Sequence, residues 1–196
     1  MGNLKLVSSE SSANQSPIKK TRKILIADAS VKDVDVLVAG LKLGIDCWMI
    51  EKDGSVQELL RKAFSNYELS ALHLLGHGMP GSITLGDVKI DIANWSYLTS
   101  GISEIAQMQP EKNSSWQKNK TYSNQWNICF WSCNTGEGSK GKIFMQHVAD
   151  CTGANVYASS NLVGHSKCGG GWQLDVVAYS SNRIAAEKKL NTKREN

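Results

Sequence analysis

Short apolar runs alternate with helix-like stretches in the first 75 residues of the chain. Apolar side chains recur at helical spacing over 34–41 and 56–64. The runs on either side of these stretches have the length of buried strands and cover 23–27, 45–50 and 69–75. Parallel strands need a crossover connection, usually a helix, so this alternation predicts an α/β fold with a parallel sheet.

The rest of the chain predicts three more strands, a hairpin and two helices. With 196 residues the chain is long enough for one domain, which we place at 23–182, with a mostly parallel sheet of five or six strands. The further elements expected, in chain order, are a hairpin over 82–92, a helix over 94–108, a strand over 126–131, a helix from about 141 to 151, a strand over 154–159 and a glycine-rich turn with a last strand over 169–176.

Positive charge is concentrated at the ends of the chain. Residues 1–22 predict a flexible basic arm, 183–196 a basic tail, and the polar stretch 109–125 an exposed loop. Residues 1–23 carry +4 and the tail +3, so 24–182 carries −3 within a net charge of +4. A nucleic-acid-binding domain carries its positive charge on the folded surface, so we expect no nucleic-acid partner.

The apolar runs and the cysteines bear on the compartment. No apolar run approaches the roughly 18 residues that cross a bilayer, and the first 23 residues lack the apolar core of a secretory signal. The five cysteines are irregularly spaced and odd in number, which does not suggest a disulfide framework. We therefore expect a soluble, cytoplasmic protein with free thiols.

Two residues with catalytic chemistry follow predicted strands. His77 comes after the strand at 69–75, and Cys133 comes after the strand at 126–131. If these strands are neighbours, both side chains leave the sheet at its carboxyl edge, where α/β proteins gather functional groups. An imidazole there can take the proton of a thiol nucleophile. The backbone N–H of Gly78 could stabilise negative charge on a substrate oxygen.

The motifs around these residues resemble the caspase-like cysteine peptidases, which include caspases, metacaspases, gingipains and separase. His77 precedes Cys133 by 56 residues, close to the spacing of about 50 in caspases. The chain is most similar to a caspase-like domain of unassigned function near the N-termini of large bacterial repeat-containing surface proteins. The resemblance covers about 23–180, and its motifs are Asp28, His77-Gly78-Met79-Pro80-Gly81, Leu85-Gly86, Cys133-Asn134, Ala158-Ser159-Ser160-Asn161-Leu162-Val163-Gly164 and Gly170-Gly171-Trp172-Gln173-Leu174.

This resemblance implies a caspase-like three-layer αβα sandwich and a cysteine endopeptidase that needs no cofactor. His77 would be the general base or acid and Cys133 the nucleophile, with the N–H groups of Gly78 and Cys133 as the oxyanion hole. The substrate would be a protein or peptide. Self-cleavage within 109–125 is a further hypothesis.

The resemblance also implies where a substrate would bind. The acidic Asp28 would favour a basic substrate side chain. Ser132 stands where relatives that prefer basic residues often carry Asp. The remaining substrate-binding candidates are Ser159, Ser160 and Asn161.

Two alternatives compete with a peptidase. A caspase-like scaffold could be catalytically silent and act as a binding or adhesion module, since a fold does not dictate a function. A zinc-stabilised domain is the lesser alternative, because two pairs of residues have the spacing and chemistry of zinc ligands: His147 with Cys151, and His165 with Cys168. A histidine packed at the edge of the core explains the first pair more simply, and we expect no metal.

Overall fold

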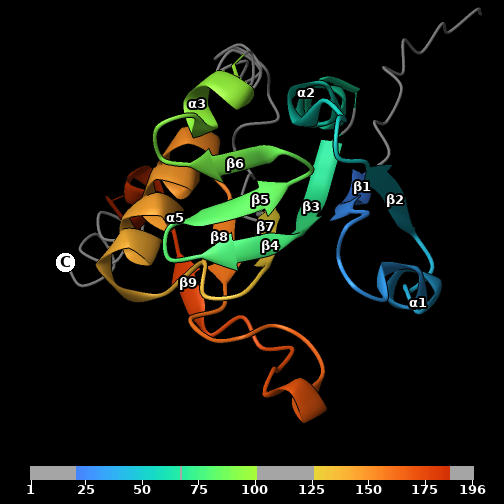
Figure 1. Cartoon of the computed structure of the whole chain (residues 1–196). Coiled ribbons are helices and arrows are strands. Elements are labelled where there is room, and N and C mark those ends of the chain that lie inside the picture. The colour runs from blue at the N-terminus through green and yellow to red at the C-terminus, as the bar shows by residue number, and fades with distance from the viewer. Residues whose placement is uncertain (1–20, 67, 101–125, 186–196) are drawn as a thin grey trace, which may run out of the picture.

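The computed structural model describes residues 21–66, 68–100 and 126–185 (Figure 1). Its main sheet has six strands in the order β2-β1-β3-β7-β8-β9. These strands are β1 (Thr21–Asp28), β2 (Ile45–Ile50), β3 (Glu68–Leu75), β7 (Asn127–Trp131), β8 (Asn155–Ala158) and β9 (Val176–Ala178). The described helices include α1 (Val34–Ala39), α2 (Val56–Asn66), α3 (Trp95–Leu98), α5 (Gly138–Thr152) and the short 3-10 helix η2 (Ser166–Cys168), and residues 181–185 are also helical.

The main sheet is parallel except at one edge. β1 pairs with β2 and with β3, β3 pairs with β7, and β7 pairs with β8, all in parallel. β9 alone runs antiparallel, against β8. The predicted α/β class with a mostly parallel sheet of six strands is therefore confirmed.

One face of the main sheet carries most of the core. Alternate strand residues, such as Ile26, Leu74 and Phe130, are fully buried there because successive side chains of a strand point to opposite faces. Helices α2, α3 and α5 lie over this face together with a second sheet (Figure 1). That sheet contains β4 (His77–Met79), β5 (Ser82–Leu85) and β6 (Val88–Asp91), all antiparallel.

The opposite face packs against α1. Leu25, Ala27 and Leu75 form a smaller buried cluster there with Val34 of the helix. Within the described residues, the sheet thus lies between two layers, as a three-layer αβα sandwich requires.

Three predicted elements differ from the structure. The hairpin at 82–92 is part of a three-stranded sheet, because β4 adds His77–Met79 to it. The helix expected over 94–108 is seen as α3, which ends at Leu98, and residues 101–108 lie outside the described residues. The last strand forms at Val176–Ala178 rather than within 169–176.

The structure describes only a small part of the predicted N-terminal arm and C-terminal tail, and none of the predicted polar loop. β1 begins at Thr21, inside the predicted N-terminal arm, and Arg22 forms an ion pair of 2.8 Å with Asp46. Residues 1–20, 101–125 and 186–196 lie outside the described residues. Within the described part of the chain, none of the helices has the length and apolar character needed to cross a bilayer.

Candidate functional site

His77 and Cys133 follow two neighbouring strands of the main sheet. β3 pairs with β7 in parallel, and the last paired positions are Leu75 and Trp131. The Gly76 N–H extends this ladder by donating to the Trp131 carbonyl at 3.3 Å. His77 and Cys133 are each two residues beyond the last pair, so the backbone leads both to the carboxyl edge of the sheet.

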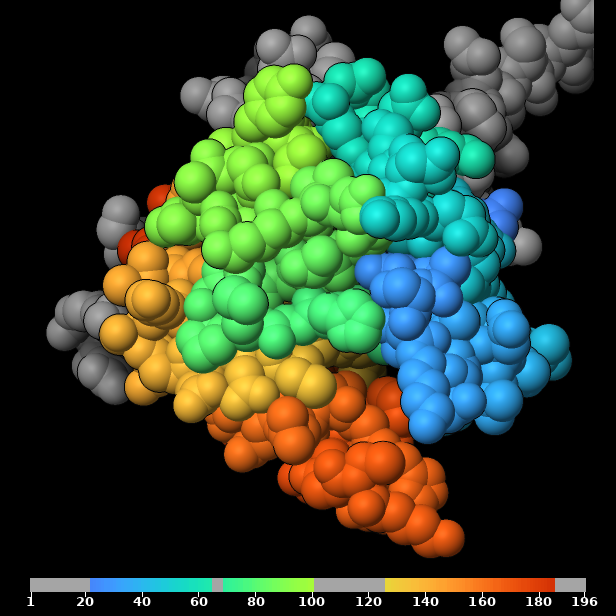
Figure 2. Space-filling model, viewed as in Figure 1, coloured from blue at the N-terminus to red at the C-terminus, as the bar shows by residue number. Residues whose placement is uncertain are grey.

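The segment after β7 reaches the surface between two other parts of the chain. In the space-filling view it lies in yellow between the second sheet, in green, and the orange segment that follows β8 (Figure 2). Contacts with both neighbours hold the backbone around Cys133.

Gly78 brings β4 into direct contact with the Cys133 backbone. A Cβ on Gly78 would lie 2.4 Å from the Cys133 carbonyl oxygen and 2.5 Å from Thr135 Oγ1. No side chain fits at that distance, so glycine permits this close approach. The contact places the residue next to His77 against the residue proposed as nucleophile.

A buried hydroxyl network ties the Cys133 segment to the second sheet. Thr135 is fully buried, and its hydroxyl donates to the Ser82 carbonyl at 3.0 Å. The Ser132 hydroxyl lies 2.6 Å from Thr135 Oγ1 and can donate to it. The Gly81 N–H also donates to the Thr135 carbonyl at 3.1 Å. Sequence reasoning missed Thr135, although it stands in the Ser-Cys-Asn-Thr run.

The segment after β8 holds Cys133 from the other side. The Val163 N–H points to Cys133 Sγ at 3.4 Å, and Sγ lies 3.7 Å from the Val163 carbonyl oxygen. The Asn134 N–H donates to the Asn161 carbonyl at 2.9 Å. Both backbone groups of Val163 thus contact the sulfur of Cys133.

The turn after Cys133 is left-handed. Asn134 has a φ of 60°, one of two positive φ values at non-glycine residues among those described. Its side-chain amide donates to Glu137 Oε2 at 2.7 Å. Asparagine tolerates this conformation better than most residues, and such conformations cluster at functional sites.

His77 is exposed on β4. Among the described residues, no hydrogen bond joins its ring to Cys133 Sγ, and the sulfur instead contacts Val163. The two residues share one edge of the sheet, and the His77 side chain is exposed there.

Three of the predicted substrate-binding residues have buried side chains. Asp28 is 1% exposed, and its oxygens accept the N–H groups of Ser30 at 2.8 Å and Gly86 at 3.0 Å. Ser132 belongs to the buried hydroxyl network. Ser159 is 2% exposed, and its hydroxyl accepts the Asn161 N–H at 3.1 Å. These groups hold the fold together and offer no open surface to a substrate.

The other two candidates reach the surface beside an acid that sequence reasoning missed. Ser160 donates its N–H and its hydroxyl to the two oxygens of Asp175, at 2.8 and 2.5 Å. The side-chain hydrogen bond from Ser160 is the main cause that lowers the pKa of Asp175, with the backbone hydrogen bond second. The Asn161 amide donates to Ser160 Oγ at 3.2 Å. An ionised carboxylate thus bonds to Ser160, next to the Asn161–Val163 stretch that contacts the Cys133 segment.

An apolar cavity of about 210 Å³ lies under the site, on the α1 side of the sheet. His73, Trp131 and Trp172 contribute to its lining. The Trp131 indole N–H donates to His73 Nδ1 at 3.1 Å, so the ring carries its proton on the other nitrogen. Burial, and secondarily the charge of Lys23, lowers the pKa of His73, which keeps the ring neutral.

The predicted zinc ligands are not brought together. Among the residues that the structure describes, no three His, Cys, Asp or Glu side chains are grouped to hold a metal ion. His147 and Cys151 face Ser96 of α3, whereas His165 Nδ1 accepts the Lys167 N–H at 3.0 Å on the loop after β8.

Comparison of the sequence with known families finds one family, and no activity is assigned to it. The model of a domain of unknown function, DUF4347, matches residues 24–194. The chain belongs to the DUF4347 family. The match spans the described strands almost completely and includes both His77 and Cys133. No curated protein matches this DUF4347 chain significantly.

Proposed function

We propose that the chain is a caspase-like cysteine endopeptidase with His77 and Cys133 as its catalytic pair. The observation that supports this most directly is the adjacency of β3 and β7, which leads both residues to one edge of the sheet in register. Contacts between Gly78 and the Cys133 backbone add a second link between the two halves of the site.

The proposed reaction forms and then hydrolyses a thioester. Cys133 Sγ attacks the substrate carbonyl carbon while its proton passes to the His77 imidazole, and the imidazole then protonates the leaving amine. Water, deprotonated by His77, releases the acyl group and regenerates the thiol. The N–H groups of Gly78 and Cys133 are proposed to stabilise the oxyanion. Catalytic contacts are often loose before substrate binds, which accommodates an exposed His77.

The proposed substrate is a peptide with a basic side chain near the cleaved bond. Because Asp28 is buried, we assign the attraction of that side chain to Asp175, beside Ser160 and Asn161. The lowered pKa of Asp175 keeps its carboxylate charged at neutral pH. Self-cleavage at the basic residues of 109–125 follows from the same preference and stays a prediction.

Cleavage of a peptide library by the full chain tests the proposal. Cys133→Ala should abolish cleavage, and His77→Ala should lower kcat/KM by about 10²–10⁴, the usual contribution of proton transfer. Cys168→Ala is the matched control, because this exposed thiol lies outside the site and its loss should leave cleavage unchanged. Cleavage that persists in Cys133→Ala would contradict the proposal.

A catalytically silent binding module is the competing function, and the bonding of Cys133 Sγ to Val163 rather than His77 favours it. Alkylation separates the two. A catalytic pair predicts fast labelling of Cys133 that is lost in His77→Ala. Uniform slow labelling of the five thiols, with no peptide cleaved, would favour the module.

A further inference from the structure

A second cysteine–histidine contact lies on α5, away from Cys133. Cys151 Sγ is 3.6 Å from His147 Nε2, and the two residues share a helix face because they are four positions apart. Ser96 of α3 completes the cluster, with its hydroxyl 3.1 Å from His147 Nε2 and 3.7 Å from Cys151 Sγ. A thiol, an imidazole and a hydroxyl therefore lie within mutual hydrogen-bonding reach.

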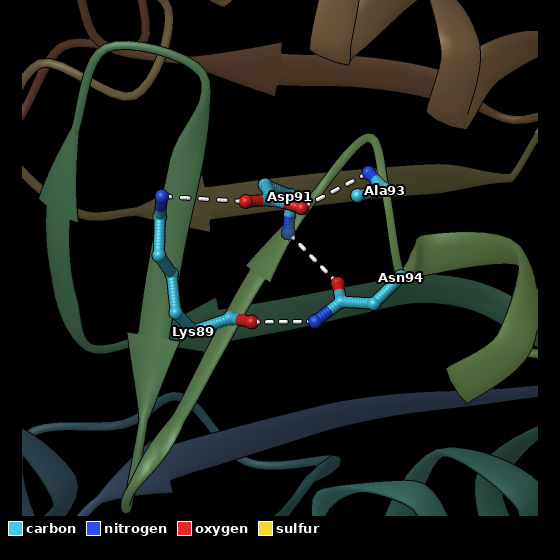
Figure 3. Close-up of polar contacts among 4 residues, drawn as sticks. All are labelled: Lys89, Asp91, Ala93 and Asn94. Atoms are coloured by element: carbon cyan, nitrogen blue, oxygen red, sulfur yellow. Dashed lines mark hydrogen bonds and ion pairs between the residues drawn. The ribbon is translucent and has the colours of Figure 1, made fainter.

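Polar contacts among the residues that precede Ser96 fix the position of the turn into α3. Figure 3 shows the polar contacts at the turn into α3. The Asn94 side chain donates to the Lys89 carbonyl at 2.7 Å and accepts the Asp91 N–H at 3.0 Å. Asp91 also accepts the Ala93 N–H at 2.9 Å and forms an ion pair of 3.3 Å with Lys89 (Figure 3).

Core packing fixes the helix on its inner side. Trp95, next to Ser96, is fully buried, with its ring edge-on to Phe130 and Phe144 at centroid distances of 6.2 and 6.3 Å. Phe144 belongs to α5, so the contact between the Trp95 and Phe144 rings packs α3 against α5. Ser96, His147 and Cys151 therefore lie on two helices that pack against each other.

The cluster is separate from the candidate site. Cys151 lies near the carboxyl end of α5, whereas Cys133 precedes the amino end of that helix. Thirteen positions separate Gly138 from Cys151, and at 1.5 Å per residue the helix carries them roughly 20 Å apart.

The three groups can move a proton away from the thiol. His147 Nε2 can accept the Cys151 proton directly across 3.6 Å, or through the Ser96 hydroxyl, which is within reach of both atoms. The thiolate is the reacting form of cysteine, and a neighbouring base that takes the proton raises its reactivity. Cys151 is also partly accessible, as a modification site requires.

We propose that Cys151 is a second reactive thiol, a covalent modification site for small disulfides, with His147 as its base. In the exchange, Sγ attacks one sulfur of the disulfide while its proton passes to His147. A new S–S bond joins Cys151 to that half, and the old S–S bond breaks. The other half leaves as a thiolate and takes the proton from the imidazolium. Cys151 is oxidised, and the released half is reduced.

The other thiols of the chain provide internal comparisons. Burial raises the pKa of Cys129 to about 11, which opposes its reaction. Cys168 is the one exposed thiol among the five and lies on η2. The neighbouring His165 ring accepts the Lys167 N–H, and in the described part of the chain no side-chain hydrogen bond joins it to the Cys168 thiol. If exposure alone governed the rate, Cys168 would react before Cys151.

The test measures exchange with an aromatic disulfide whose released thiolate absorbs visible light, using the full chain with Cys133→Ser. Mass mapping assigns each modified cysteine. Cys151 should react about tenfold faster than Cys168, a comparison that needs no change within the cluster. His147→Gln should slow Cys151 about tenfold and leave Cys168 unchanged, and Ser96→Ala should slow Cys151 by less.

Equal or slower reaction of Cys151 relative to Cys168 would overturn the proposal, as would an unchanged Cys151 rate in folded His147→Gln. Thermal unfolding of each variant shows whether it is folded. Because Cys133 is absent from every protein compared, the outcome is independent of the proposed peptidase activity.

Discussion

Asn134 carries a backbone constraint directly beside the proposed nucleophile. Its positive φ turns the chain so that its own N–H meets Asn161 and the following residues enter the buried hydroxyl network. The conformation is costly for a residue with a Cβ, and it persists because both neighbouring segments hold it.

Comparing Asn134→Ala with Asn134→Gly isolates this backbone cost. Both variants lose the side-chain bond to Glu137, so their difference reports how alanine and glycine differ in backbone preference at this position. The alanine variant should be less stable by about 1–2 kcal/mol in denaturant unfolding. Equal stabilities would mean that the turn relaxes to another conformation.

His73 should make stability depend on pH. Burial lowers its pKa in the folded protein, so the unfolded chain binds a proton more readily. Its contribution is fully present above the ordinary histidine pKa of about 6.5 and is lost as the pH falls below that value. Wild type should therefore lose more stability than His73→Gln between pH 7 and the acid side of this range. Parallel pH profiles of the unfolding free energy would contradict the assignment.

At the scale of elements, β4 decides how the site is assembled. Its three residues bring His77 to the sheet edge and press Gly78 against the Cys133 carbonyl. Through Ser82 and Gly81, the turn between β4 and β5 also bonds to Thr135. The second sheet thus fixes the position of the segment after β7 through these contacts.

Gly78→Ala should disrupt the contact between β4 and the segment after β7. The added Cβ overlaps backbone and buried hydroxyl atoms, so we expect a loss of about 1–3 kcal/mol in unfolding free energy, as for other overpacked sites. Gly171→Ala is the matched control, because a Cβ there meets no atom within 4 Å. Its effect should stay within about 0.5 kcal/mol. A harmless Gly78→Ala would show that β4 can move away from Cys133.

The sequence pattern predicted correctly those helices and strands that bury an apolar face. The strands at 45–50 and 69–75 and the amphipathic helix that precedes each of them were predictable, because burial imposes a period on their side chains. β4 was not, since its side chains at 77 and 79 are exposed and its strand conformation comes from pairing with β5. The helix expected over 94–108 ends in the structure at Leu98, and the part predicted beyond residue 100 lies outside the described residues.

Of the candidate site, only the residues that follow predicted strands could be identified from the sequence. The sequence placed His77 and Cys133 after two apolar runs, and parallel pairing brings such ends together. It could not show that the Gly86 N–H, 58 residues along the chain, would occupy the carboxylate of Asp28. Nor could it show that Asp175 would meet Ser160, because that contact joins two loops without periodic pattern.

At the scale of the whole molecule, the two residues of the proposed pair come from opposite sides of residues 101–125. His77 belongs to the part before this stretch and Cys133 to the part after it. The parts are joined by the β3–β7 ladder, by Gly78 and by the Thr135 bonds. All of these are non-covalent.

We therefore expect the contacts between the two described parts to assemble this edge of the sheet even without backbone continuity between residues 100 and 126. Two polypeptides, ending and beginning at those positions, should recombine into one particle when refolded together, and size-exclusion chromatography would detect it. Cys133 alkylation in that nicked species should match the intact chain. On this expectation, a cut between residues 100 and 126 would leave His77 and Cys133 together at one edge of the sheet.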